Sequence, residues 1–197
     1  CVWDVASGNR VSTLDEHKFK VHGNVHSAQF NSNGTMIVSA SGDNNVYLWG
    51  VASGDCIQTL NGHSSYVTSV QFSSDDKKIV SGSADKTVRV WDMATRNCVQ
   101  TLEGHSGVVN SAQFSEKDDT KIVSASDDRT VRIWNVNTKE CIQRVDDNIQ
   151  STVSAQFSLD GKKFVFATLG HIVVEPRDEY NRNYTESMNN NYWTIIE

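Results

Sequence analysis

The sequence predicts an all-β protein: a segment of a β-propeller with three complete four-stranded antiparallel blades and partial blades at both ends. The first observation is a repeat, in which the pair Gln-Phe recurs every 42 or 43 residues, at Phe30, Phe72, Phe114 and Phe157. The second is that each period contains four short strand-like runs joined by polar turns, without helical periodicity. A sheet this small cannot bury both of its faces alone, so we expect the sheets to pack side by side as blades.

The period that begins at Val67 illustrates the expected elements in order. Its first run alternates between apolar and polar residues, which is typical of a half-buried strand. The four strands predicted in this period are 67–72, 78–83, 87–91 and 98–102. Polar turn residues separate them at 73–76, 84–86 and 93–97.

The repeat region is predicted to span 1–176 and to be followed by an asparagine-rich tail, 177–197, outside the propeller. Its parts are a half blade at 1–14, full blades at 17–60, 63–102 and 105–145, and a degenerate blade at 148–176. The half blade corresponds to a third and a fourth strand alone. Four additional residues near 18–21 lengthen the first full blade.

Two arrangements of the ends stay open at the level of the sequence. In the first, the chain is a piece of a larger ring, and its exposed strand edges favour self-association. In the second, the strands of 1–14 pair with those of 151–168 and close a small ring of four blades.

Four residue types recur in register along the chain. In three copies Ser precedes Asp by four residues, and Asp precedes Trp by six. The sets are His17, Ser39, Asp43 and Trp49; His63, Ser81, Asp85 and Trp91; and His105, Ser124, Asp128 and Trp134. The degenerate blade has Asn148, Phe166, Gly170 and Pro176 at these positions, so it retains none of the four types.

These copies resemble the WD40, or tryptophan-aspartate, repeat family. The resemblance implies one buried structural hydrogen-bond network in each blade, and the residue types suit it: an indole donates, a carboxylate accepts, and Ser and neutral His do both. The alternative is a hydrolase triad of His63, Asp85 and Ser81. Because the same trio recurs at one register in three blades, we expect it to be structural, and we predict no catalytic residue and no cofactor.

Composition and charge exclude several classes of partner. Lys and Arg number 18 against 24 Asp and Glu, a net charge of −6, and no basic block is present, so nucleic acid is not an expected partner. The longest apolar stretch, 164–174, is too short to cross a bilayer, so no membrane partner is expected.

The cysteines and histidines are expected to hold neither a disulfide nor a metal. Cys56, Cys98 and Cys141 each follow a Trp by seven residues, so they occupy equivalent places in successive blades, too far apart for bonding. Free thiols fit a reducing compartment, the cytoplasm or the nucleus. A metal site of His17, His22 and His26 is the alternative to one network histidine with two polar neighbours; we predict no metal.

The function expected from these features is a non-catalytic scaffold for protein–protein interaction, as a segment of a larger protein that binds other proteins or peptides. The candidate partner-binding residues are Tyr66, Lys86, Arg89, Arg129 and Arg132. An exposed aromatic ring can anchor an interface, and a row of cations can bind acidic or phosphorylated peptides. A phosphopeptide or substrate-receptor adaptor of the ubiquitin-ligase type is an alternative, and a propeller hydrolase is a more distant one.

Overall fold

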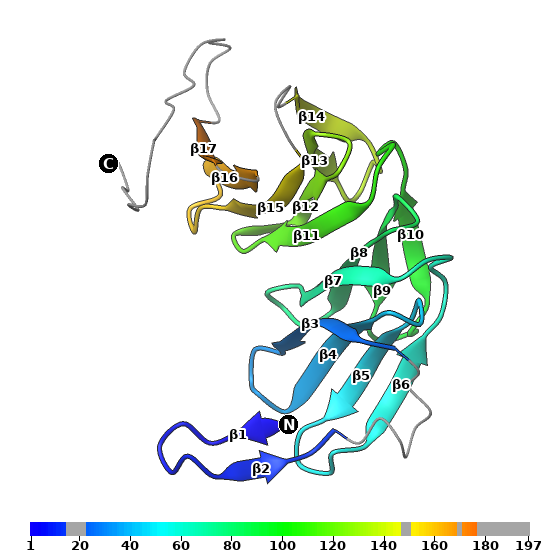
Figure 1. Cartoon of the computed structure of the whole chain (residues 1–197), viewed down its shortest axis with the longest axis vertical. Coiled ribbons are helices and arrows are strands. Elements are labelled where there is room, and N and C mark those ends of the chain that lie inside the picture. Colours follow the sequence, from blue (N-terminus) through cyan, green and yellow to red (C-terminus); the bar gives the residue numbers. More distant parts are fainter. Residues whose placement is uncertain (15–22, 147–150, 169–170, 177–197) are drawn as a thin grey trace.

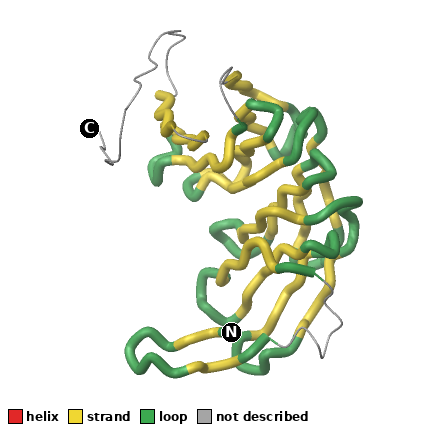
Figure 2. Tube along the Cα trace, in the orientation of Figure 1, coloured by secondary structure: helices red, strands yellow, loops and turns green. Residues whose placement is uncertain are grey.

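The computed structural model describes residues 1–14, 23–146, 151–168 and 171–176, the last of these as backbone alone. These residues form strands and turns without a helix (Figure 2). The strands build antiparallel sheets that follow one another along a curved arc (Figure 1). The predicted fold class, all-β with three four-stranded sheets and partial sheets at the ends, is confirmed.

Each sheet consists of strands that are consecutive in the chain. The N-terminal hairpin contains β1 (Val2–Trp3) and β2 (Arg10–Ser12). The first blade contains β3 (Val25–Phe30), β4 (Met36–Ser41), β5 (Val46–Gly50) and β6 (Cys56–Leu60). The second blade contains β7 (Val67–Phe72), β8 (Lys78–Ser83), β9 (Val88–Asp92) and β10 (Cys98–Leu102).

The same order continues to the C-terminal side. The third blade contains β11 (Val109–Ser115), β12 (Asp118–Ser126), β13 (Thr130–Asn135) and β14 (Cys141–Asp146). The C-terminal sheet contains β15 (Thr152–Phe157), β16 (Lys163–Thr168) and β17 (His171–Pro176). The tail predicted at 177–197 lies outside the described residues.

The hydrophobic core is divided into layers between neighbouring sheets. One layer joins the first and second blades, with Val38 and Leu48 packed against Phe72 and Ile79. A second joins the second and third blades, and a third joins the third blade to the C-terminal sheet. β-branched residues dominate the middle strands because both faces of each sheet are covered and such residues pack well on a pleated surface.

The small closed ring is not formed. The N-terminal hairpin and the C-terminal sheet are separate sheets in the described residues, and Figure 1 shows them at opposite ends of the arc. The physical reason is visible at both ends: β17 occupies the edge of β16, where a third strand belongs, while Val2 of the hairpin packs against Ile37, Tyr47 and Trp49 of the first blade.

Candidate functional site

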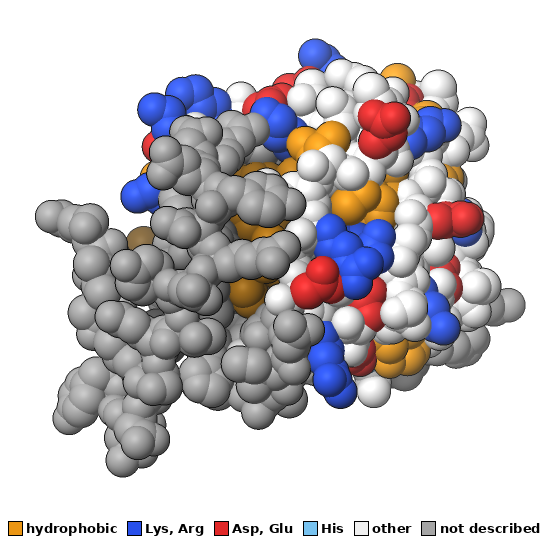
Figure 3. Space-filling model, turned by 90° about the horizontal axis from the view of Figure 1, so that it is seen from above, with side chains coloured by type: hydrophobic (Ala, Val, Ile, Leu, Met, Phe, Trp, Pro, Cys, Tyr) orange, Lys and Arg blue, Asp and Glu red, His pale blue; other side chains and the backbone are white. Residues whose placement is uncertain are grey.

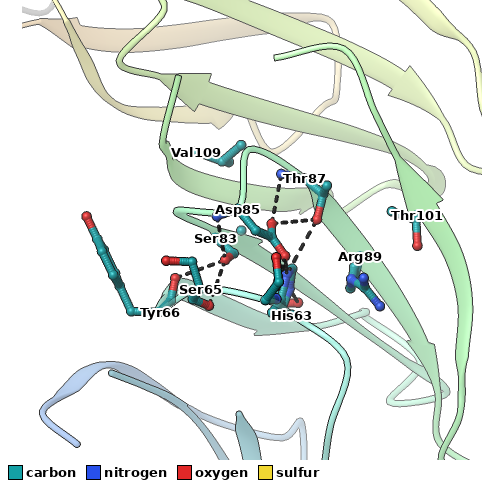
Figure 4. A network of polar contacts seen from close by, with 12 residues as sticks. His63, Ser65, Tyr66, Ser83, Asp85, Thr87, Arg89, Thr101 and Val109 are labelled. Carbon is teal, nitrogen blue, oxygen red and sulfur yellow. Dashed lines mark hydrogen bonds and ion pairs between the residues drawn. The ribbon is translucent and has the colours of Figure 1, made fainter. Parts of the chain in front are cut away.

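The polar residues of the second blade form a continuous hydrogen-bond chain from one edge of the sheet to its middle. His63, in the segment before β7, contacts Asp85 in the β8–β9 turn through Nδ1 (2.7 Å) and Ser81 of β8 through Nε2 (2.8 Å). The indole Nε1–H of Trp91 in β9 donates to Ser81 Oγ at 2.9 Å. Figure 4 shows how the imidazole and the carboxylate meet beside the turn.

The third blade repeats this arrangement with the same atoms. His105 lies 2.8 Å from Asp128 Oδ2 and 2.8 Å from Ser124 Oγ, and Trp134 Nε1–H donates to Ser124 at 2.8 Å. The carboxylate of Asp128 also accepts from the backbone N–H of Ser106 and from the hydroxyl of Thr130. Asp85 has the equivalent partners, Ser64 and Thr87.

The proton positions follow from the chemistry of the groups. A carboxylate can only accept, so the imidazole proton sits on Nδ1; Ser Oγ accepts from the indole and donates to Nε2. This assignment requires neutral histidine, and burial lowers the pKa of His105 against the opposing effect of Asp128. Burial would raise the pKa of Asp85, but hydrogen bonds from His63 and Thr87 outweigh it and hold that pKa well below its usual range.

The first blade carries a variant of the network. Trp49 Nε1–H donates to Ser39 Oγ at 2.9 Å, as in the other blades. The phenol of Tyr47 donates to Asp43 at 2.6 Å, and burial together with this bond raises the pKa of Tyr47 to about 12. His17 lies outside the described residues. The sequence pattern did not indicate a role for Tyr47, which stands where the next two blades have arginine.

The C-terminal sheet replaces the network by hydrophobic packing. Phe166 occupies the position of Ser81 and Ser124 and is 2% exposed, in one cluster with Phe164 and Phe157. A third strand, β17, forms here although the sequence lacks the tryptophan motif, because main-chain pairing with β16 does not depend on it.

A hydrolase triad would need a serine that a substrate can reach. Ser81 and Ser124 are each 0% exposed, and the side chains of His63 and Asp85 are 0% and 5% exposed. The trio is therefore enclosed in the blade, and its partners are used up by neighbouring protein atoms.

Tyr66 lies on the surface as the sequence predicts, at 41% exposure. Its ring centroid lies 5.7 Å from that of His26 at the start of β3. With Gly23, Asn24 and Gly42 these two rings line an open depression of about 410 Å³, here called the Tyr66 surface. The sequence argument did not find this depression, because its two sides come from different blades.

The four candidate cations do not share one surface. Lys86 and Arg129 are exposed at the tips of equivalent turns. Arg89 and Arg132 are half-buried along the blades: Arg89 Nη1 lies 3.9 Å from Cys98 Sγ, and the guanidinium of Arg132 lies 5.7 Å from the ring centroid of Trp134. A Cβ atom at Gly104 would come within 2.5 Å of Arg132 Nη1, so this glycine leaves the space that the arginine fills.

A second depression of about 300 Å³ follows the inner ends of the three blades. Its acidic residues are engaged in ties between blades. Asp76 accepts from the backbone N–H and hydroxyl of Ser32, and Asp119 accepts from the same two groups of Ser74. These carboxylates hold neighbouring turns together, a role that the sequence pattern did not reveal.

The remaining predictions concern thiols, metals and membranes. All four cysteines are free. Among the described residues no group of three or more His, Cys, Asp or Glu side chains is placed to hold a metal ion; His17 and His22 lie outside these residues. The described part of the chain contains no helix long and apolar enough to span a membrane.

Comparison with known proteins agrees with the network geometry. The family model described as "WD domain, G-beta repeat" matches residues 8–50, 54–92 and 96–135, which is more than half of the chain. Each matched segment begins near an outer strand and ends with the third strand of the next sheet. A search of curated proteins gave no match. The chain belongs to the WD40 repeat family.

Proposed function

We propose that the chain is a non-catalytic interaction scaffold that binds other proteins or peptides through the loops at the blade ends. The residues that repeat between blades are consumed inside them, as the His63 and His105 networks illustrate. The residues that differ between blades lie in the connecting loops. A rigid frame that holds variable loops is the usual basis of a specific binding surface.

The observation that carries the proposal is the Tyr66 surface. Tyrosine and histidine rings offer apolar area together with a polar tip, which suits a site where part of the ligand is buried and part is solvated. Gly23 and Gly42 expose main chain between them, so a peptide backbone can approach closely. The ligand class that fits is a peptide segment with one apolar side chain flanked by hydrogen-bonding groups.

The phosphopeptide-adaptor alternative has less support from the same geometry. Recognition of a phosphate group favours a guanidinium that is free to form two parallel hydrogen bonds. Arg89 and Arg132 are held along the blades, which leaves Lys86 and Arg129 exposed on separate turns.

A random-peptide library displayed on phage tests the proposal. Peptides selected on the wild-type chain should lose about tenfold or more in affinity for the variant Tyr66→Ala, since truncated aromatic anchors cost at least 1.4 kcal/mol in typical interfaces. Ile57→Ala is the matched control, because Ile57 has the same exposed fraction, 41%, on the outer strand β6. Selected peptides that bind the Tyr66→Ala variant as tightly as the wild type would contradict this site.

A further inference from the structure

The first strand of the first blade has an uncovered face. At equivalent positions, Phe72, Phe114 and Phe157 are 6%, 3% and 9% exposed, whereas Phe30 is 47% exposed. Val67 and Val109 are fully buried, whereas Val25 is 52% exposed. Sequence and backbone are the same at these positions, so the difference lies in what packs against them. Val25, Ala28 and Phe30 are here called the β3 face.

In the other sheets, the preceding sheet covers this face. Phe72 packs on the first blade, Phe114 on the second and Phe157 on the third. The N-terminal hairpin covers only the outer part of the first blade, through the contacts of Val2 with Ile37, Tyr47 and Trp49. The hairpin has the third and fourth strands of a blade, and the two inner strands that would cover the β3 face are lacking beside it.

Two hydrogen bonds define how one sheet receives the next. A glutamine amide oxygen accepts from the backbone N–H of the next phenylalanine: Gln29 from Phe72 (3.0 Å) and Gln71 from Phe114 (2.8 Å). A serine hydroxyl accepts from the backbone N–H two residues before that phenylalanine. These pairs are Ser69 with Ala112 (3.0 Å) and Ser111 with Ala155 (3.1 Å).

The C-terminal sheet presents the receiving half of this interface. Ser154 and Gln156 of β15 stand at the positions of Ser69 and Gln71. Val165 and Ala167 of β16 stand at the positions of Val80 and Val123 and of Gly82 and Ala125. Gln156 is exposed and Val165 half-buried, whereas Val80 and Val123, covered by the following blade, are fully buried. Figure 3, seen from above this end of the arc, shows hydrophobic side chains open beside the residues drawn in grey.

We propose that the β3 face binds the outer face of β15 and β16 of a second copy of this chain, so that copies associate head to tail. Gln156 of one copy then accepts from the backbone N–H of Phe30 of the next, and Ser154 from that of Ala28. The two inner strands of one copy and the hairpin of the other form a composite four-stranded blade, with β1 replacing β17 at the edge of β16.

The sequence of β1 supports this exchange. Val2-Trp3-Asp4 matches Val90-Trp91-Asp92 at the end of a regular third strand, whereas β17 has Pro176 at the tryptophan position. The carboxylate tie has no counterpart at the new interface, because Leu159 stands at the position of Ser74 and Gly34 at that of Asp76. Two different faces meet in this contact, so it is heterologous and yields rings or open chains rather than a symmetric dimer.

Light scattering after gel filtration over a concentration series tests the proposal on the full chain. The mass of the wild type should rise above 21.9 kDa with concentration. Phe30→Glu should weaken association about tenfold or more, because it places a charge in the apolar contact. Val99→Glu, at an equally exposed apolar position on β10, should associate like the wild type.

A mixing experiment tests the direction of the contact. Val165→Glu should also be monomeric, and a mixture of the Phe30→Glu and Val165→Glu chains should form a dimer that grows no further, since one intact face remains on each. Gln156→Lys, at an exposed position, replaces Val165→Glu if the latter fails to fold. A monomeric wild type at every concentration, unchanged association of Phe30→Glu, or a mixture that stays monomeric would overturn the proposal. Tyr66→Ala should leave association intact, which separates this test from that of the Tyr66 surface.

Discussion

At the scale of single residues, the aspartate of each network joins more partners than any other member. Asp85 accepts from the imidazole of His63, the backbone N–H of Ser64 and the hydroxyl of Thr87, which come from both sides of the blade entrance. Removal of the carboxylate leaves these donors buried or half-buried without an acceptor, and such orphaned groups cost more than a surface hydrogen bond.

We therefore expect Asp85→Ala and Asp128→Ala each to lower the free energy of unfolding by about 2 kcal/mol or more. Urea unfolding followed by tryptophan fluorescence measures this change. Glu103→Ala, at an exposed position next to the second network histidine, should change stability by less than about 0.5 kcal/mol. Equal stability of the aspartate variants and this control would show that the networks do not brace the blades.

Acid should weaken the fold through the same groups. Hydrogen bonds from Thr130, the Ser106 backbone and His105 outweigh burial and hold the pKa of Asp128 at about 2, below its ordinary 3.8, and burial lowers the pKa of His105. In both cases the unfolded chain binds the proton more readily than the folded one, so stability is lost as pH falls. The urea midpoint should decline below about pH 6.5 as His105 titrates in the unfolded state, and more steeply between about pH 4 and 2. A midpoint that stays level or rises from pH 7 to 3 would refute this linkage.

At the scale of strands and turns, the repeat fixes backbone conformation as well as side chains. The turn between third and fourth strands has a left-handed residue at one recurring position: Gly8 and Gly54 in the first two sheets, then Arg96 and Lys139. Glycine adopts this conformation freely, whereas a residue with a Cβ is strained there by about 1 kcal/mol or more.

Lys139→Gly should thus stabilise the chain by about 0.5 kcal/mol, after the greater freedom of glycine in the unfolded state is subtracted. Lys139→Ala keeps the strain and should leave stability nearly unchanged. Urea midpoints of the two variants decide the matter, and a glycine variant less stable than the alanine variant would contradict the strain argument.

The strands and the network residues could be predicted from the sequence because both depend on short-range patterns. Alternation in 67–72 and the fixed Ser-Asp-Trp spacing are properties of a single blade. The bond of Tyr47 to Asp43, the ties of Asp76 and Asp119, and the Tyr66 surface depend on side chains that meet from different strands or blades. No local pattern marks such contacts, and for the same reason the small closed ring could not be decided from the sequence.

At the scale of the whole molecule, packing between neighbouring sheets supplies what a single sheet lacks. Each inner-strand phenylalanine fills the layer next to the preceding blade, except where that blade has no inner strands. The arc thus has a covered interior and two different ends, and this asymmetry underlies the proposed head-to-tail contact.

Matched truncations should report this asymmetry. Phe114→Ala removes a side chain that is 3% exposed and should cost about 3 kcal/mol, whereas Phe30→Ala at 47% exposure should cost less than about 1 kcal/mol in dilute, monomeric protein. Similar losses at both positions would mean that the β3 face is covered within one chain.

The account as a whole claims that the repeated polar residues are enclosed in the blades, which leaves the loops for binding. Hydrogen exchange of the tryptophan indole N–H groups, followed by NMR, tests this claim in three blades at once. The indoles of Trp49, Trp91 and Trp134 are at most 3% exposed and donate to serines, so they should exchange slowly, while Trp3 at 61% exposure should exchange fast. Ser81→Ala should speed exchange at Trp91 and spare Trp134. Exchange of Trp91 and Trp134 as fast as that of Trp3 would contradict the account.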